Sequence, residues 1–184
     1  MLSKEYQDHI ASLLDALDIP PALLADKCMQ ACAPAHQLTL VQTDADGREH
    51  HLLPAAAQAW QDMKAAAQAE GIVLEIVSAF RDLERQTEII RAKQARGMAI
   101  ETILTLSAAP GYSEHHTGRA IDINTPGCLP TEEEFERTEA FAWLSRHAGR
   151  FGFSLSYPRG NPHGFIYEPW HWCYQPDSAS ESRA

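Results

Sequence analysis

Two segments in the second half of the chain each combine a histidine with a carboxylate. In the first, His115 lies in a predicted loop and Asp122 follows inside a short apolar strand. A carboxylate between Ile121 and Ile123 is costly to bury unless it is paired or bound to a metal ion. The first segment therefore predicts either a hydrogen bond between His115 and Asp122 or part of a metal site.

The second segment, around Pro169, places Glu168 and His171 in a predicted strand. Because side chains alternate between the faces of a strand, these two residues can serve one site only if the backbone twists or bulges between them. Two histidines and one carboxylate leave the fourth position of a tetrahedral zinc ion open for water, and a second carboxylate could take a proton from that water. Alternatively, His115 bonds only to Asp122 and the tryptophans beside His171 are core. Spacing alone leaves both interpretations open.

The elements that must hold these residues follow from the apolar periodicity of the chain. Helices are predicted as a pair within 3–33 and over 54–70, 82–96, 98–107 and 130–150, and strands over 38–41, 48–53, 72–77, 119–123, 151–157 and 168–174. An Asp-Gly turn joins the first two strands into a hairpin, where His50 and His51 are predicted to be solvated. Helices and strands do not alternate regularly, so we predict an α+β fold in which a small antiparallel sheet is flanked by helices.

Length and charge limit the classes of protein to which the chain can belong. Its 184 residues, of which 45% are apolar, suit one domain with a substantial core. Acidic residues outnumber basic ones by 25 to 15, and the resulting net charge of −10 repels phosphate backbones and anionic lipid. No apolar run approaches the roughly 18 residues of a membrane-spanning helix. We therefore expect neither nucleic acid nor a membrane as a partner.

The chain is expected to form a single domain over 1–174. Its predicted parts are N-terminal helices and a hairpin (1–53), a catalytic core (54–174) and a polar, disordered tail (175–184). Near the N-terminus, acidic residues such as Glu5 and Asp8 stand where a secretory signal would have a basic segment followed by an apolar one. The sequence therefore predicts a cytoplasmic protein.

Three motifs follow one another along residues 78–174. They are Ser78-Ala79-Phe80-Arg81 followed by Gln86, then Ser113-x-His115-x-x-Gly118-x-Ala120-x-Asp122, then Glu168-x-x-His171. In this order they resemble the signature of the VanY-type zinc D-alanyl-D-alanine carboxypeptidase family. The resemblance implies the zinc peptidase fold that this family shares with VanX dipeptidases, phage endolysin peptidases and the hedgehog signalling domain.

The resemblance also implies a role for each motif residue. His115, Asp122 and His171 would be the zinc ligands. Glu168 would be the general base that takes a proton from water and later returns it to the leaving amine. Arg81 would hold the scissile carbonyl and stabilise the oxyanion that forms on it, a charge-assisted contact.

Five further residues are expected to contact or surround the substrate. The resemblance implies that Ser113 and Gln86 hold its terminal carboxylate and nearby amides, and Ser78 belongs to the same expected set. His116, beside a ligand, is predicted to face the substrate or to support the ligands, with a solvated loop histidine as the alternative. Trp170 is predicted to form an apolar wall beside Glu168, although a core tryptophan needs no such role.

The reaction implied by the resemblance is hydrolysis that releases a C-terminal D-alanine from a peptidoglycan stem peptide. A cytoplasmic enzyme would meet either the pentapeptide precursor or recycled tetrapeptides, and destroying the precursor would starve cross-linking. We therefore favour an L,D-carboxypeptidase acting on tetrapeptides in cell-wall recycling. The alternatives are D,D-carboxypeptidase activity on pentapeptides, an endopeptidase, and a zinc-bearing binding module without turnover. A pure binding module would need neither Glu168 nor Arg81.

Overall fold

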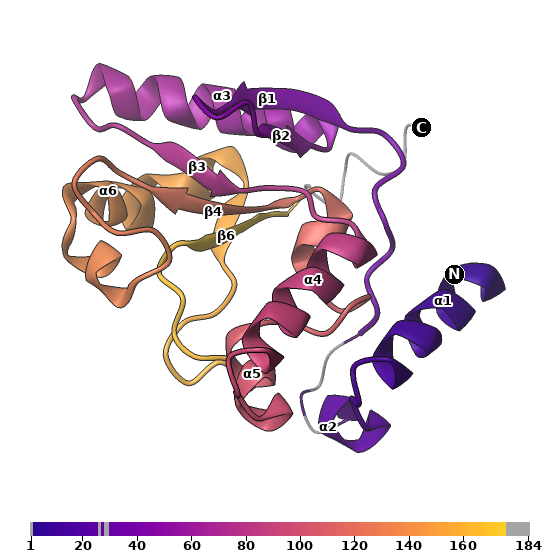
Figure 1. The fold of residues 1–184 in the computed structure, drawn as a ribbon. Coiled ribbons are helices and arrows are strands. Elements are labelled where there is room, and N and C mark those ends of the chain that lie inside the picture. The colour runs from indigo at the N-terminus through magenta and orange to yellow at the C-terminus, as the bar shows by residue number, and fades with distance from the viewer. Residues whose placement is uncertain (1, 26, 28–29, 176–184) are drawn as a thin grey trace.

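The computed structural model describes residues 2–25, 27 and 30–175, and its centre is a four-stranded antiparallel sheet (Figure 1). The strands lie in the order β3-β4-β6-β5, with the bounds Glu75–Ser78 for β3, Ala120–Asn124 for β4, His171–Tyr174 for β6 and Phe153–Leu155 for β5. Each neighbouring pair is antiparallel. The predicted α+β class with a small antiparallel sheet is confirmed.

A hairpin and a long helix cover one face of this sheet (Figure 1). The hairpin consists of β1 (Thr39–Thr43) and β2 (Glu49–Leu52), and α3 (Pro54–Ala69) follows it directly. Trp60 and Met63 of α3 are almost fully buried in one apolar cluster with Ile121 and Ile123 of β4. Because side chains alternate along β4, Asp122 must point to the opposite face of the sheet.

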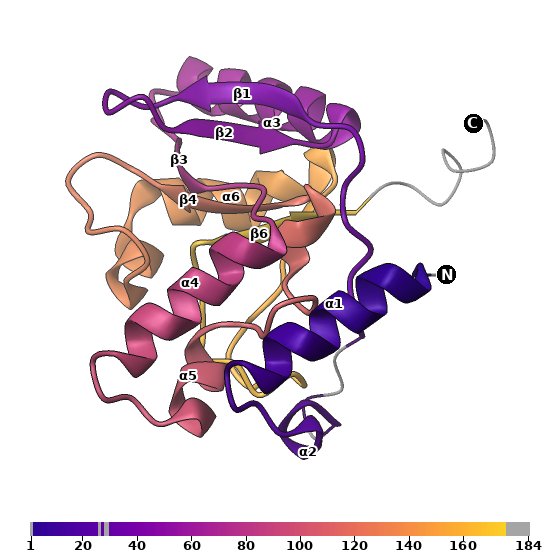
Figure 2. The same ribbon diagram turned by 45° about the vertical axis from the view of Figure 1, so that its right-hand side comes forward.

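The second face carries α4 (Leu83–Gln94), α5 (Ile100–Leu106) and the N-terminal helices α1 (Lys4–Asp15) and α2 (Pro21–Ala25) (Figure 2). A separate apolar cluster joins them and contains Leu17, Ile19, Leu24, Ile90, Ile103 and Leu104. Gln94 of α4 donates a hydrogen bond to the carbonyl oxygen of Leu17 at 2.9 Å. The N-terminal segment therefore packs on the two helices that stand over the Asp122 face.

The prediction of one continuous helix over 130–150 is wrong. The segment forms a 3-10 turn (Glu133–Arg137), α6 (Glu139–His147) and a second 3-10 turn (Ala148–Phe151). Thr138 interrupts the helix with extended backbone angles, and its side chain accepts a hydrogen bond from the Phe141 amide at 3.1 Å. A threonine N-cap of this kind satisfies one of the free amides at a helix start, so it begins a new helix.

The hairpin differs from the prediction at one histidine. His50 was expected in solvent but is 2% exposed, and its Nε2 lies 2.7 Å from Oδ2 of Asp44. The acidic turn residue and the strand histidine therefore pair across the hairpin, whereas His51 stays partly exposed. Residues 176–184 of the predicted tail lie outside the described part of the chain, in which no helix is long and apolar enough to cross a membrane.

Candidate active site

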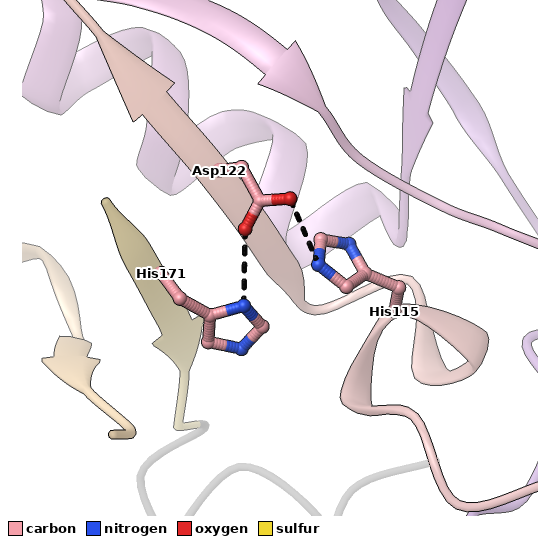
Figure 3. Close-up of side chains that lie close together, drawn as sticks. All are labelled: His115, Asp122 and His171. Carbon is pink, nitrogen blue, oxygen red and sulfur yellow. Dashed lines mark hydrogen bonds and ion pairs between the residues drawn. The ribbon is translucent and has the colours of Figure 1, made fainter. Parts of the chain in front are cut away.

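His115, Asp122 and His171 meet on the face of the sheet that carries α4 and α5 (Figure 3). Asp122 lies in the middle of β4, and His171, the first residue of β6, is its direct cross-strand partner. Oδ1 of Asp122 is 3.0 Å from Nδ1 of His171, and Oδ2 of Asp122 is 3.3 Å from Nε2 of His115. The donor atoms of all three residues lie within 4.8 Å of one another.

A short 3-10 turn, Glu114–Thr117, presents His115 to the site. Ser113 caps this turn by accepting a hydrogen bond from the His115 amide, and Gly118 ends it in the left-handed region at φ 66°. A Cβ atom at Gly118 would come within 3.1 Å of the Leu53 amide nitrogen. Glycine is therefore needed at this position for two reasons, the backbone angle and the close approach of the hairpin.

The second nitrogen of each histidine ring is held by an oxygen atom. Nδ1 of His115 donates to the carbonyl oxygen of Ala79 at 2.6 Å, which leaves Nε2 to face Asp122. Nε2 of His171 lies 2.9 Å from Oε2 of Glu114, which also accepts a hydrogen bond from the Ser156 hydroxyl at 2.6 Å. These contacts fix which ring nitrogen points into the site, as the outer partners of metal-binding histidines do.

The three side chains suit a zinc ion. All three are buried, and Nε2 of His115 is a buried nitrogen without a hydrogen-bond partner among the described residues. With Nδ1 donating to Ala79, this Nε2 offers only a lone pair. Two imidazole nitrogens and one carboxylate oxygen are the donor set of a catalytic zinc centre, which keeps a fourth position open.

Burial and charge set the protonation of the metal-free site. Burial lowers the pKa of His115 to about 4, so this ring is neutral at pH 7, as a ligand must be. Burial alone would also lower the pKa of His171, but hydrogen bonds to Asp122 and Glu114 raise it to about 10. His171 is thus an imidazolium between two carboxylates, in a place that is electrostatically suited to a cation.

Glu168 lies in the turn before β6, and the prediction that it belongs to that strand is wrong. The turn is closed by a hydrogen bond from the His171 amide to the Glu168 carbonyl, and the Glu168 amide bonds to Tyr157. This turn brings Oε2 of Glu168 to 3.8 Å from Nδ1 of His171, which removes the difficulty of their odd spacing. Burial raises the pKa of Glu168 to about 7, a suitable value for a general base near neutral pH.

A cavity of about 280 Å³ opens over the three candidate ligands. Four other residues singled out from the sequence line it, namely Arg81, Ser113, Glu168 and Trp170. The Arg81 amide donates to the His115 carbonyl oxygen at 3.3 Å, so the backbone that carries the guanidinium is joined to the backbone that carries a ligand. The cavity therefore combines a candidate metal site with a buried carboxylate and a cation.

The other three predicted substrate-binding residues are not among those that line the cavity. Gln86 donates to the carbonyl oxygen of Ala108 at 2.7 Å and so supports a cavity wall. Ser78 is buried on β3, where it pairs in register with Asp122. His116 is also buried, which rules out a solvated loop histidine: its Nδ1 donates to the Arg81 carbonyl oxygen, and its Nε2 accepts from the Gly111 amide.

Three residues that face the site were missed by sequence reasoning. Glu114 holds His171, the Tyr157 ring lies with its centroid 4.7 Å from that of His171, and Lys93 lines the cavity from α4. Glu114 could have been suspected from its place between Ser113 and His115. No local pattern marks Tyr157 or Lys93, because their roles depend on the packing of distant segments.

The antiparallel sheet and the three buried candidate ligands fit the zinc peptidase fold that the sequence motifs indicated. The family model described as "VanY: D-alanyl-D-alanine carboxypeptidase" matches residues 49–177. This range includes the candidate ligands, Glu168 and Arg81. The chain therefore belongs to the VanY family, as the sequence motifs indicated.

Individual relatives agree with this assignment. A D-alanyl-D-alanine carboxypeptidase of Enterococcus faecalis is 37% identical over 124 residues, which are 62% of this chain and 44% of the relative. The structure of the LdcB LD-carboxypeptidase matches with a TM-score of 0.69 at 28% identity, covering 82% of this chain and 73% of that one. The vancomycin-resistance D,D-pentapeptidase VanY in complex with Zn(II) matches with a TM-score of 0.59 at 28% identity, covering 79% and 85%. The chain spans about half the length of the curated relatives it matches.

Proposed function

We propose that this protein is a zinc-dependent carboxypeptidase that releases the C-terminal D-alanine from peptidoglycan stem peptides. The observation that carries the proposal is the placement of Glu168 and Arg81 in the same cavity as the three candidate ligands. A metal site that only binds would need neither a buried carboxylate nor a cation beside it. Membership of the VanY family supports the choice of substrate class.

His115, Asp122 and His171 would hold the zinc ion through Nε2, a carboxylate oxygen and Nδ1 respectively. Bound zinc would supply a Lewis acid that polarises a carbonyl and lowers the pKa of water. Side chains of the cavity carry out the remaining steps. In these steps one water molecule reacts with the carbonyl carbon of the last peptide bond, and the amine leaves.

Glu168 accepts a proton at its carboxylate from the attacking water, whose oxygen forms the new bond to the carbonyl carbon. Its pKa of about 7 in the metal-free site suits both acceptance and return of that proton. Arg81 stabilises the negative charge that develops on the carbonyl oxygen. When the C–N bond breaks, Glu168 returns the proton to the nitrogen of the departing D-alanine, so the base is regenerated.

Within this class we favour L,D-carboxypeptidase activity on tetrapeptides, with a cytoplasmic role in cell-wall recycling. The choice rests on the expected cytoplasmic location, where recycled tetrapeptides are available and where destroying the pentapeptide precursor would starve cross-linking. D,D-carboxypeptidase activity on pentapeptides is the second candidate, because the vancomycin-resistance D,D-pentapeptidase VanY is among the similar structures as well as the LdcB LD-carboxypeptidase. Cell fractionation tests the proposed location.

Mass spectrometry of disaccharide tetrapeptide and pentapeptide, each incubated with the zinc-loaded protein, separates the candidates. Loss of one alanine from the tetrapeptide is the expected result and identifies an L,D-carboxypeptidase. Loss from the pentapeptide alone identifies D,D-activity and removes the recycling role. If neither peptide loses alanine while zinc remains bound, the proposed function is wrong. The matched control is Glu168→Ala, which leaves all three ligands in place.

A further inference from the structure

Lys93 places a second cation in the cavity. It lies in the last turn of α4, is half-buried, and lines the same cavity as Arg81 and Glu168. Its Nζ donates a hydrogen bond to the hydroxyl of Ser107 at 2.9 Å. Among the described residues, the lysine and arginine ion pairs involve Lys4, Arg85 and Arg159 and none involves Lys93.

The positive charge of the Lys93 ammonium group is only partly compensated by the groups around it. Burying a cation is unfavourable unless an anion accompanies it, and a neutral hydroxyl oxygen satisfies only one of the three N–H donors of lysine. Burial lowers the pKa of Lys93, and attraction by Glu168 offsets this only in part. By contrast, the exposed Lys4 has a carboxylate partner, Asp8, at 2.8 Å. Lys93 therefore has donors available toward the cavity.

The roles proposed above leave this cation unused. Arg81 is assigned to the scissile carbonyl, and Asp122 and Glu168 are assigned to zinc and to proton transfer. A substrate of the proposed class carries free carboxylates of its own. One is the C-terminal carboxylate of the leaving D-alanine, and another is the distal carboxylate of a diaminopimelyl residue in the stem peptide.

We propose that Lys93 binds a free carboxylate of the stem peptide in the cavity and is a specificity-determining residue. This inference rests on the proposed function, because that function supplies the anion. Ser107 holds the lysine side chain against the cavity wall, so that the charge meets the carboxylate without searching many rotamers. The interaction forms in the bound substrate and persists in the transition state.

The test compares wild-type protein with Lys93→Met and Lys93→Arg on two tetrapeptides, one with diaminopimelate and one with lysine at the third position. A charge-assisted hydrogen bond of this kind predicts that Lys93→Met lowers kcat/KM by about 10-fold to 100-fold. The loss is expected in KM, because the contact is equal in the ground and transition states. Lys93→Arg keeps the cation and is expected to retain most of the affinity. Lys64→Met, on α3 beside Trp60 and not among the cavity-lining residues, is the matched control.

The two substrates distinguish the source of the carboxylate. An equal loss on both identifies a carboxylate that the two peptides share, such as the C-terminal one, and a loss on the diaminopimelate peptide alone identifies the distal one. The inference is overturned if Lys93→Met stays within about twofold of wild type on both peptides, or if it lowers kcat with KM unchanged, which would indicate a structural role.

A binding measurement keeps this inference separate from the proposed function. Calorimetry measures how tightly two zinc-loaded variants, Glu168→Ala and the double variant Glu168→Ala/Lys93→Met, bind the uncleaved diaminopimelate tetrapeptide. If wild-type protein released no alanine, the proposed function would fail, whereas a weaker affinity in the double variant would still assign the carboxylate contact to Lys93. Equal affinities would overturn that contact.

Discussion

Glu114 is expected to tighten zinc binding although it contributes no ligand atom. Its Oε2 lies 2.9 Å from Nε2 of His171, and this contact leaves Nδ1 of His171 as the nitrogen that faces Asp122. Replacing Glu114 with alanine removes the acceptor, so the ring can rotate or change its tautomer. Loss of such an outer partner commonly weakens metal affinity by about 10-fold to 100-fold, or about 1.4 to 2.7 kcal/mol.

The surroundings of Glu114 narrow this range. The His171 side chain is 4% exposed, but that of Glu114 is 29% exposed, so solvent screens the carboxylate partly. We therefore expect Glu114→Ala to weaken zinc binding by about 10-fold to 30-fold, in the lower half of the range. Glu114→Gln keeps an acceptor oxygen without the charge and should lose less.

Competition between the metal-free protein and a chromophoric zinc chelator measures these affinities. Ser156→Ala is the matched control, because the Ser156 hydroxyl donates to the same Oε2 atom, whereas the bond of Ser156 to His171 runs from its backbone amide to the His171 carbonyl oxygen and is kept in the alanine variant. It should remain within about threefold of wild type, because the variant loses one hydrogen bond to the Glu114 carboxylate and keeps the contact of that carboxylate with His171. A Glu114→Ala protein that bound zinc within twofold of wild type would refute the reasoning. Nitrogen chemical shifts of His171 supply a second readout of its tautomer.

Three further expectations follow from the same site. Glu168→Ala should keep stoichiometric zinc and lower kcat by about 100-fold to 10,000-fold, whereas His115→Ala should lose the metal. Steady-state kinetics with metal analysis checks both variants, and near wild-type turnover in Glu168→Ala would contradict its assignment as the general base. Zinc and a proton compete for Nδ1 of His171, whose pKa is raised, so the affinity for zinc should fall as pH falls, by about tenfold per pH unit for one displaced proton. Chelator titrations between about pH 8 and pH 6 test this, and a zinc affinity that did not change with pH would exclude histidine ligation. Gly118→Ala should destabilise the protein by about 1 to 3 kcal/mol, because the φ angle of 66° and the nearby Leu53 amide would strain an alanine there. Urea unfolding measures this loss, and an unchanged midpoint would argue against strain at this position.

The sequence carried most of the information about the ligands and the elements that present them. The alternation of Ile121, Asp122 and Ile123 places the carboxylate opposite the apolar core, because a strand has a period of two residues. The hairpin and α3 were also predictable, since the Asp-Gly turn and Pro54 act through local backbone preferences. The order of the motifs then indicated the family, which the family model confirms.

Sequence reasoning was wrong where backbone geometry or contacts between distant segments decide the local structure. Glu168 was predicted on a strand, but a turn closed by the His171 amide carries it into the site. The predicted helix over 130–150 breaks because the side chain of Thr138 caps a new helix. His50, expected in solvent, is buried and pairs with Asp44 of the hairpin turn.

The donor types, their order along the chain and the faces on which alternation puts them can be worked out from the residues alone. The second partners of these groups depend on the three-dimensional packing. Glu114 and His171 are 57 residues apart in the chain, and Lys93 meets Ser107 across 14 residues, yet each pair is within hydrogen-bond distance. The physical reason is that hydrogen bonds and ion pairs act over a few ångströms, so they depend on how β4, β6, α4 and α5 pack and not on spacing along the chain.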